Sequence, residues 1–328
     1  MKIEAIHDLA RFLSIANDWH SLAARSTRAT PFQLPEWGYT WWKSFGSGEL
    51  RVFAGWQDGA LVGLLPCFLH SWNDRRQITI LGSGISDYLG VLVAPENSTA
   101  FLDGVREHLM ASKDWDVCDW QDLSDNDVLR CLKCSSELRL RQTEDTPCAR
   151  RSLESSEDEF LRNLSSGLRR NVRRYAKHFG EVGAVDFGIA CGAESDLVEC
   201  ILELHTREWN RRGASGMVEQ TGSGPFLRAV ANEFSKQNRF RLFYISLDQK
   251  PVACIYAIIH ERVAYGYMSG FDPDYGQFSL GTLVIAHAMR CSISEGLRAW
   301  DFLRGTESYK FNWGAEAIPK WRLRIERQ

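Results

Sequence analysis

The chain has 328 residues, of which 44% are apolar and 12% aromatic, enough for about two domains with sizeable cores. Its net charge of −3 excludes a global attraction to nucleic acid or membrane, so a basic partner site has to be local. The start, MKIEAIHDLARF, lacks the basic and apolar regions of a signal peptide, and the apolar runs 60–69 and 252–259 are too short to span a bilayer. We therefore expect a cytoplasmic protein without membrane insertion and without a DNA partner.

Nine cysteines, an odd number, lie in apolar surroundings, which is typical of reduced thiols rather than of a disulfide framework. Cys131 and Cys134 form a CxxC pair. A zinc site needs a second pair of ligands, and Cys148, with no histidine close by in the sequence, is a poor candidate. The sequence therefore predicts no metal site.

The first recognisable segment, residues 51–70 (RVFAGWQDGALVGLLPCFLH), returns without a gap at 241–260 (RLFYISLDQKPVACIYAIIH). Five positions are identical: Arg51 and Arg241, Phe53 and Phe243, Asp58 and Asp248, Val62 and Val252, His70 and His260. Gly, Pro and Asp mark a tight turn in each copy, so both copies predict a strand, a turn and a longer strand.

The order of elements after each hairpin is also the same. A strand at 78–84 or 263–270 is followed by a loop, a helix and a last strand at 115–123 or 300–305. This order predicts an α/β (α+β) protein built from two copies of one domain, with a boundary near residue 150. We assign 1–150 to the first half and 151–328 to the second.

The second half begins with a basic helix within 157–183 that stops near Gly180. Its cations recur at three- and four-residue steps: Arg169, Arg170, Arg173, Arg174 and Lys177. No acidic partner sits at i+4 among these residues. We expect this face, through Arg170, Arg173 and Arg174, to bind phosphates of a ligand. A solvated face and a contact with protein or RNA remain alternatives.

A second candidate anion site is DPDYGQFSLGTL (272–283), where a strand ends and a helix begins at Ser279. Backbone N–H groups of Leu280, Gly281 and Thr282 would point out of the helix start, where the macrodipole favours an anion. Gly281 would allow close approach of a pyrophosphate. An ordinary loop with a glycine at the helix start is the alternative.

The last predicted strand ends in a crowd of ionisable residues, AWDFLRGTESYKFNWG (299–314), which contains Asp301, Arg304, Glu307, Tyr309 and Lys310. Strand ends beside a cofactor loop are suited to catalysis. Asp301 is a candidate base or orienting residue, and a strand-end cap is the alternative. Arg304 is a candidate clamp for an acidic group, or an ion-pair partner of the neighbouring carboxylates. Lys310 is a candidate for binding a carboxylate or phosphate, or plain surface.

Several segments together resemble a known family. They are FQLPEWGYTWWKSFG (32–46), LGSGISDYLGVLVAPE (81–96), LRRNVRRYAKHFG (168–180), ELHTREWNRRG (203–213) and residues 269–314. The order of elements resembles the GNAT acyltransferase fold. More closely, residues 30–318 resemble the BioF2-like (CelD/BcsL) acetyltransferases, which are related to the FemAB peptidyltransferases. The resemblance implies two tandem GNAT-like domains, each a mixed, mostly antiparallel sheet flanked by helices.

The resemblance implies acyl transfer from acyl-CoA to an amine or hydroxyl of a small, for example sugar-linked, acceptor, and a link to polysaccharide biosynthesis. GNAT folds bind the pyrophosphate at Q/R-x-x-G-x-G/A. Here the frame is GQFSLG (276–281), in which Gly281 matches, Ser279 replaces a glycine and Gln277 lies beside the polar position. By chain order Tyr309 corresponds to the GNAT tyrosine that protonates the leaving thiol. Asp87 and Tyr88 of the first half are candidates for holding the acceptor.

Two other functions stay open. One is a FemAB-like transferase with an aminoacyl-tRNA donor, although the helical-hairpin insertion with heptads is missing from this sequence. The other is a non-catalytic binding or scaffold protein, which the altered GQFSLG loop would favour. His205 is a further candidate on a predicted helix, where a satisfied or exposed histidine is the commoner case.

Overall fold

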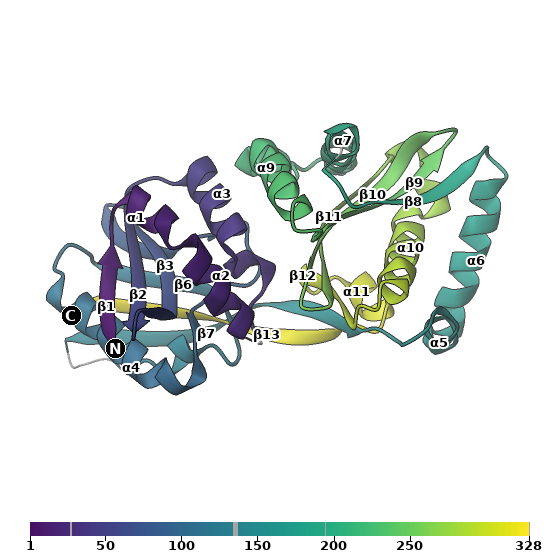
Figure 1. Ribbon diagram of the computed structural model, residues 1–328. Coiled ribbons are helices and arrows are strands. Elements are labelled where there is room, and N and C mark those ends of the chain that lie inside the picture. Colours follow the sequence, from purple (N-terminus) through teal and green to yellow (C-terminus); the bar gives the residue numbers. More distant parts are fainter. Residues whose placement is uncertain (27, 134–136, 194, 328) are drawn as a thin grey trace. The chain divides into compact units, whose positions relative to one another are not determined.

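The computed structural model describes residues 1–26, 28–133, 137–193 and 195–327 (Figure 1). The chain forms two compact units. Unit 1 comprises Met1–Pro147 together with Ile318–Gln328, and unit 2 comprises Cys148–Ala317. The sequence analysis assigned 318–328 to the second half, but these residues lie in unit 1, because they pair with one of its strands.

Unit 1 contains a mixed sheet in which neighbouring strands are antiparallel, except for the parallel pair β4 and β6. Its strands, in sheet order, are β1 (Lys2–Ile6), β2 (Glu49–Gln57), β3 (Ala60–Trp72), β4 (Arg75–Ile80), β6 (Val117–Ser124) and β13 (Glu316–Arg327), and β5 (Leu92–Val93) pairs with β3. Its helices are α1 (Leu9–Ser14), α2 (Ala16–Arg25), α3 (Pro35–Phe45) and α4 (Ser98–Ala111), with the short 3-10 turns η1 (Pro31–Gln33), η2 (Pro95–Asn97) and η3 (Val128–Cys131).

Unit 2 repeats this plan. Its strands, in sheet order, are the end of β7 (Leu138–Ser152), β12 (Ala299–Arg304), β11 (Val263–Phe271), β10 (Lys250–His260), β9 (Phe240–Leu247) and β8 (Val185–Ala190). Only β11 and β12 run parallel. Its helices are α5 (Glu157–Asn163), α6 (Ser166–Gly180), α7 (Ser195–Arg211), α8 (Met217–Thr221), α9 (Gly224–Ser235), α10 (Leu280–Ser294) and α11 (Ser308–Asn312), with η4 (Pro273–Phe278) before α10.

The repeated hairpins fold alike because their turns are alike. Asp58 and Gly59 have φ of 50° and 79°, and Asp248 and Gln249, 190 positions later, have φ of 49° and 67°. Two consecutive residues with positive φ give the primed turn whose twist suits a two-residue hairpin. The predicted hairpins and the mixed, mostly antiparallel sheets flanked by helices are therefore confirmed.

The sheet of unit 2 is covered on both faces (Figure 1). Side chains alternate along β11, so that Gly270 faces α7 while the ring of Phe271 faces Gly281 of α10. Apolar residues of α10, among them Leu283 and Met289, pack with those of β9 and β10 in a buried core. Two sequential helices, α5 and α6, replace the single helix expected in 157–183.

Two of the three cysteines considered as metal ligands lie among the described residues. Cys131 and Cys148 are free thiols, and Cys134 lies outside the described residues. Among the described residues no group of histidine, cysteine and carboxylate side chains is arranged to hold a metal ion. In that same part of the chain, no helix combines the length and apolarity needed to cross a bilayer.

Candidate active site

The two parallel strands of unit 2 diverge. They pair from Val263 with Ala299 to Tyr265 with Asp301. Beyond that point β11 continues to Phe271 beside β10, and β12 continues to Arg304 beside β7. Past Tyr265 and Asp301 the two facing edges therefore no longer pair with each other, although some backbone groups there serve other contacts, among them the Leu303 N–H and the Ser269 carbonyl.

The end of β12 is shaped by Asp301. Its side chain has no exposed surface, and its carboxylate accepts hydrogen bonds from the backbone N–H of Leu303 and from Nε of Arg150, each at 2.8 Å. Leu303 has a φ of 61°, and the pairing of β12 with β7 shifts register between Asp301 and Arg304. Asp301 therefore holds a bend in the strand and neutralises the arginine opposite to it.

The buried Lys310 supports the same bend. Its side chain is 3% exposed. The ammonium group donates to the carbonyls of Leu303, at 3.3 Å, and of Arg304, and forms a 3.0 Å ion pair with Glu307. Arg304 is half-buried. These contacts explain much of the crowding at 299–314, and the catalytic roles of Asp301 and Lys310 stay predictions.

Unit 1 contains a related arrangement. Asp119, which corresponds to Asp301 in strand register, lies opposite Arg324 on β13 and pairs with Arg322. Asp122 has a φ of 59°, and its carbonyl accepts from the buried lysine Lys320, while its N–H donates to Asp145 rather than to Asp119. An aspartate–arginine pair at this strand position and a lysine at the bend after it therefore occur in both units, with different backbone contacts.

The open edge of β11 is lined from α7 by two residues. His205 Nδ1 donates to the carbonyl of Ser269 at 2.9 Å, which leaves Nε2 unprotonated when the ring is neutral. Burial lowers the pKa of His205. Burial also raises the pKa of Glu208, which is 8% exposed, against the opposing effects of Arg212 and the Phe271 backbone.

Helix α7 reaches this edge because of a glycine. A Cβ on Gly270 would lie 2.5 Å from the backbone nitrogen of His205, so a larger residue would force the helix away. His205 was a candidate site residue from the sequence, whereas Glu208 was not. The only signal for it was the motif ELHTREWNRRG, which names no partner for this carboxylate.

Tyr309 approaches the opening from α11. The residue is 44% exposed, and its ring packs edge-on against Phe302 with a centroid distance of 6.1 Å. Burial of the hydroxyl, and then the carboxylates of Glu307 and Glu208, raise the pKa of Tyr309 to about 12. The phenol therefore keeps its proton at neutral pH, within electrostatic reach of Glu208.

The start of α10 also borders the opening. Ser279 precedes the helix with a φ of 52°, a conformation that favours glycine. The N–H of Thr282 donates to the Ser279 carbonyl at 2.9 Å and so serves the helix itself. The N–H groups of Leu280 and Gly281 belong to the first turn, which lacks intrahelical acceptors. Gln277 is exposed beside them.

The three arginines predicted to bind the cofactor differ in the contacts that they make. Tyr175 hydrogen-bonds to Ser279 and to Arg174, and these contacts lower its pKa. The Arg174 guanidinium lies 4.9 Å from the Tyr175 ring centroid. Arg174 is thus next to the start of α10. Arg170 and Arg173 are exposed on the same outward face of α6 as Arg174, away from the apolar residues that pack the helix onto the core.

Asp87 and Tyr88 belong to unit 1. Tyr88 is 3% exposed, and Lys320 Nζ lies 4.0 Å from its ring centroid. Asp87 is half-buried. Their predicted contact with the acceptor stays a prediction.

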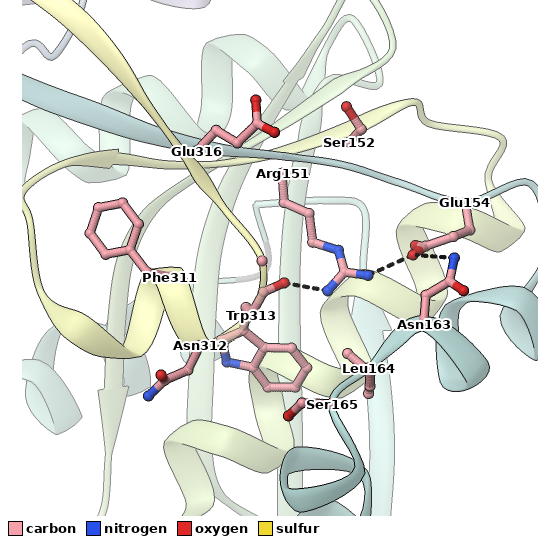
Figure 2. Close-up of a pocket in the computed structure, with 11 residues that line it drawn as sticks. Arg151, Ser152, Glu154, Asn163, Leu164, Ser165, Phe311, Asn312, Trp313 and Glu316 are labelled. Atoms are coloured by element: carbon pink, nitrogen blue, oxygen red, sulfur yellow. Dashed lines mark hydrogen bonds and ion pairs between the residues drawn. The ribbon is translucent and has the colours of Figure 1, made fainter.

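A pocket of about 510 Å³ lies elsewhere in unit 2, between the end of β7, the α5–α6 junction and the chain after α11 (Figure 2). The buried Arg151 crosses it and donates to Glu154, at 2.6 Å, and to the carbonyl of Trp313. Asn163 also donates to Glu154, at 3.3 Å. Arg151 and Glu154 thus satisfy each other, and none of the predicted site residues lines this pocket.

Part of unit 2 matches the model of a known protein family. Residues 166–311, all within unit 2, match the model of a family described as an acetyltransferase (GNAT) domain. No curated protein matches the chain in sequence. The structure is similar to that of FemX, with a TM-score of 0.70 at 11% identity, over 98% of this chain and 97% of that one.

Two further solved structures are similar over nearly their whole length. A conserved protein of unknown function from Bacteroides thetaiotaomicron gives a TM-score of 0.60 at 12% identity, covering 100% of both chains. A tandem GNAT protein from the clavulanic acid biosynthesis pathway gives 0.50 at 11% identity, over 99% of this chain and 98% of that one. The chain therefore has a fold similar to that of tandem GNAT proteins, and its residues 166–311 match the model of a GNAT acetyltransferase domain.

Proposed function

We propose that unit 2 transfers an acyl group from acyl-CoA to an amine or hydroxyl of a small acceptor, and that the chain is a BioF2-like acetyltransferase. The divergence of β11 and β12 carries this proposal. An extended thioester donor can pair with the open strand edges. Its pyrophosphate would lie at the start of α10, against the N–H groups of Leu280 and Gly281 and near Arg174.

Two ionisable residues on this opening suit the proton transfers. The acceptor nitrogen or oxygen attacks the thioester carbonyl carbon and gives its proton to the Glu208 carboxylate. The C–S bond then breaks, and Tyr309 protonates the leaving thiolate. Burial of Glu208 strengthens it as a base, and the raised pKa of Tyr309 keeps it protonated until that step.

The other predicted site residues would shape the site or bind the substrates. Asp301 and Lys310 hold the bend at the end of β12 that keeps the strands apart. Arg304 would contact an acidic group of the donor or acceptor, and Asp87 and Tyr88 would contribute to acceptor binding.

The first test is thermal unfolding with and without acetyl-CoA. A ligand at about 100 times its Kd adds roughly 2.7 kcal/mol of stability. We expect an upward shift of Tm in the wild type that Arg174→Ala and Gly281→Asp reduce and that Lys43→Ala, at an exposed position of unit 1, leaves intact.

A second candidate is transfer from an aminoacyl-tRNA donor. The observation that favours it is Ser279, whose φ of 52° places a strained residue where the acyl-CoA loop has glycine. Absence of a Tm shift with acetyl-CoA, longer acyl-CoAs and CoA would refute the acyl-CoA proposal. A shift with aminoacyl-tRNA would then identify the donor, and its absence would favour a non-catalytic binding protein.

A further inference from the structure

Three exposed cations on the outward face of α6, beside Arg174, have no part in the proposed reaction. Arg170, Arg173 and Lys177, here called the basic stripe, lie three and seven positions apart and therefore within a narrow arc of the helix. All three are exposed. Across the described ranges of the chain, no ion pair involves any of them. The chain carries a net charge of −3, so this stripe is a local exception.

Nearby carboxylates leave the basic stripe largely uncompensated. Helix α6 contains no acidic residue, and Glu181, which directly follows it four positions after Lys177, can offset one of the three charges at most. On α5, Glu157 pairs with Arg290 at 2.7 Å, and Glu159 bonds to Ser155 at 2.9 Å. Cations three or four positions apart repel one another on a helix, and an external anionic partner removes that repulsion.

Large apolar side chains lie exposed just after the same helix. Val182, Phe187 and Ile189 are 44%, 40% and 37% exposed. Phe187 and Ile189 are two positions apart on β8, the edge strand, and so point to one face. The Phe187 ring contacts His287 of α10, at a centroid distance of 5.4 Å, and α6 packs on α10 as well. The apolar residues and α6 are thus on the same side of the sheet (Figure 1).

We propose that the basic stripe and the exposed residues Val182, Phe187 and Ile189 form a docking surface for an anionic lipid bilayer. Cations contact lipid headgroups, while phenyl and aliphatic side chains enter the interface beneath them. A nucleic acid backbone offers charge but no counterpart for Val182 and Ile189, which cannot stack on bases. This docking surface is exposed, so binding to a bilayer through it does not require a membrane-spanning segment.

The test is sedimentation of the full chain with phosphatidylcholine vesicles, with and without phosphatidylglycerol. We expect binding only to the anionic vesicles at low ionic strength, and its loss at about 1 M salt, where the Debye length is about 3 Å. Each cation removed should weaken binding about fivefold, so the triple variant R170Q/R173Q/K177Q should bind about a hundredfold less.

Two variants make the test specific. K43Q/K113Q/K133Q removes three exposed lysines of unit 1 and changes the net charge equally, and should bind like the wild type. F187S/I189T should weaken binding while keeping its dependence on salt. All variants change exposed side chains, so a melting curve like that of the wild type is expected and serves as the check on folding.

Four results would overturn the proposal. They are no binding of the wild type to anionic vesicles, equal binding by the basic-stripe and control variants, full binding by F187S/I189T, and binding of poly(A) RNA through the basic stripe without binding of vesicles. Because vesicle binding is measured without acetyl-CoA, the outcome does not depend on whether the proposed acyl transfer is correct.

Discussion

At the residue scale, the open ends of β11 and β12 separate two kinds of ionisable group. Asp301 and Lys310 are buried and already engaged by the backbone and by Arg150 and Glu307. Tyr309 is 44% exposed and Glu208 lies within its electrostatic reach. A group that exchanges protons with a substrate has to be reached by it, which Tyr309 satisfies, whereas Glu208 is 8% exposed and has to exchange its ion pair with Arg212 for the substrate.

The role of Tyr309 can be tested by Tyr309→Phe. Loss of general acid catalysis typically lowers a rate about 10²–10⁴-fold, and we expect a decrease of kcat in that range for thiol release from acetyl-CoA. The Tm shift with acetyl-CoA should be unchanged. Because the pKa of Tyr309 is raised to about 12, the wild-type rate should not fall as pH approaches 10.0, the ordinary tyrosine value. A normal rate in the variant would contradict the assignment.

Glu208→Gln tests the opposite end of the pH range. A base works in its ionised form, so the wild-type rate should fall on acidification through a pKa above the ordinary 4.5 of glutamate. The variant should lose about 10²-fold or more in kcat/KM, together with that acid limb. Glu203→Gln, an exposed position on the same helix, is the matched control. An unchanged acid limb in Glu208→Gln would assign the ionisation to another group.

Chain order brings Tyr309 and its neighbours at 299–314 to the end of β12, because a strand end collects the residues that follow it, and their roles stay predictions. Chain order gave no sign of Glu208. That carboxylate meets Phe271, more than sixty positions away, through a backbone amide, and backbone groups leave no pattern in a sequence. The charge pattern predicted the exposed cations of α6, but not the contact of Arg174 with Tyr175.

At the element scale, the approach of α7 to β11 positions the site. Gly270→Ala places a methyl group against the His205 backbone. We expect a loss of stability of about 1–3 kcal/mol from overpacking, with weaker activity because His205 and Glu208 shift. Urea unfolding measures the first effect. Gly167→Ala, on α6 with open space around it, should instead stabilise by up to about 1 kcal/mol. Equal stability of both variants would show that the close approach is not needed.

The elements themselves were largely predictable. The repeat of 51–70 at 241–260 became the β2–β3 and β9–β10 hairpins, and the predicted helix from 279 to 296 is α10. The strands that pair with β12 and β6 were not predictable, because pairing between strands distant in sequence is set by packing. Strand β7 follows β6 in the chain but its end pairs with β12, and β13 follows β12 but pairs with β6.

At the scale of the whole molecule, this exchange of strands makes the two units unequal. Unit 2 is one continuous stretch, Cys148–Ala317, whereas unit 1 needs Ile318–Gln328. Leu323 and Ile325 of that segment are fully buried in the core of unit 1. Loss of one such side chain costs about 2–5 kcal/mol, which is a large part of a domain's stability.

Expression of the units separately tests this inequality. A fragment of residues 148–317 should unfold cooperatively by near-ultraviolet circular dichroism. A fragment of residues 1–147 should lack cooperative unfolding, and a peptide of residues 318–328 should restore it at least in part. Cooperative unfolding of 1–147 alone would show that the last strand is dispensable.

The exchange of strands also sets an order of events on the ribosome. The first 147 residues emerge early but cannot complete their core until residues 318–328 have been translated. At about 5–20 residues per second this is a delay of roughly 10–35 s. Unit 2 has all of its strands once β12 has been translated, before residues 318–328 are made. The half that is translated second can therefore complete its sheet first. Until residues 318–328 follow, the nascent first half exposes apolar surface to chaperones.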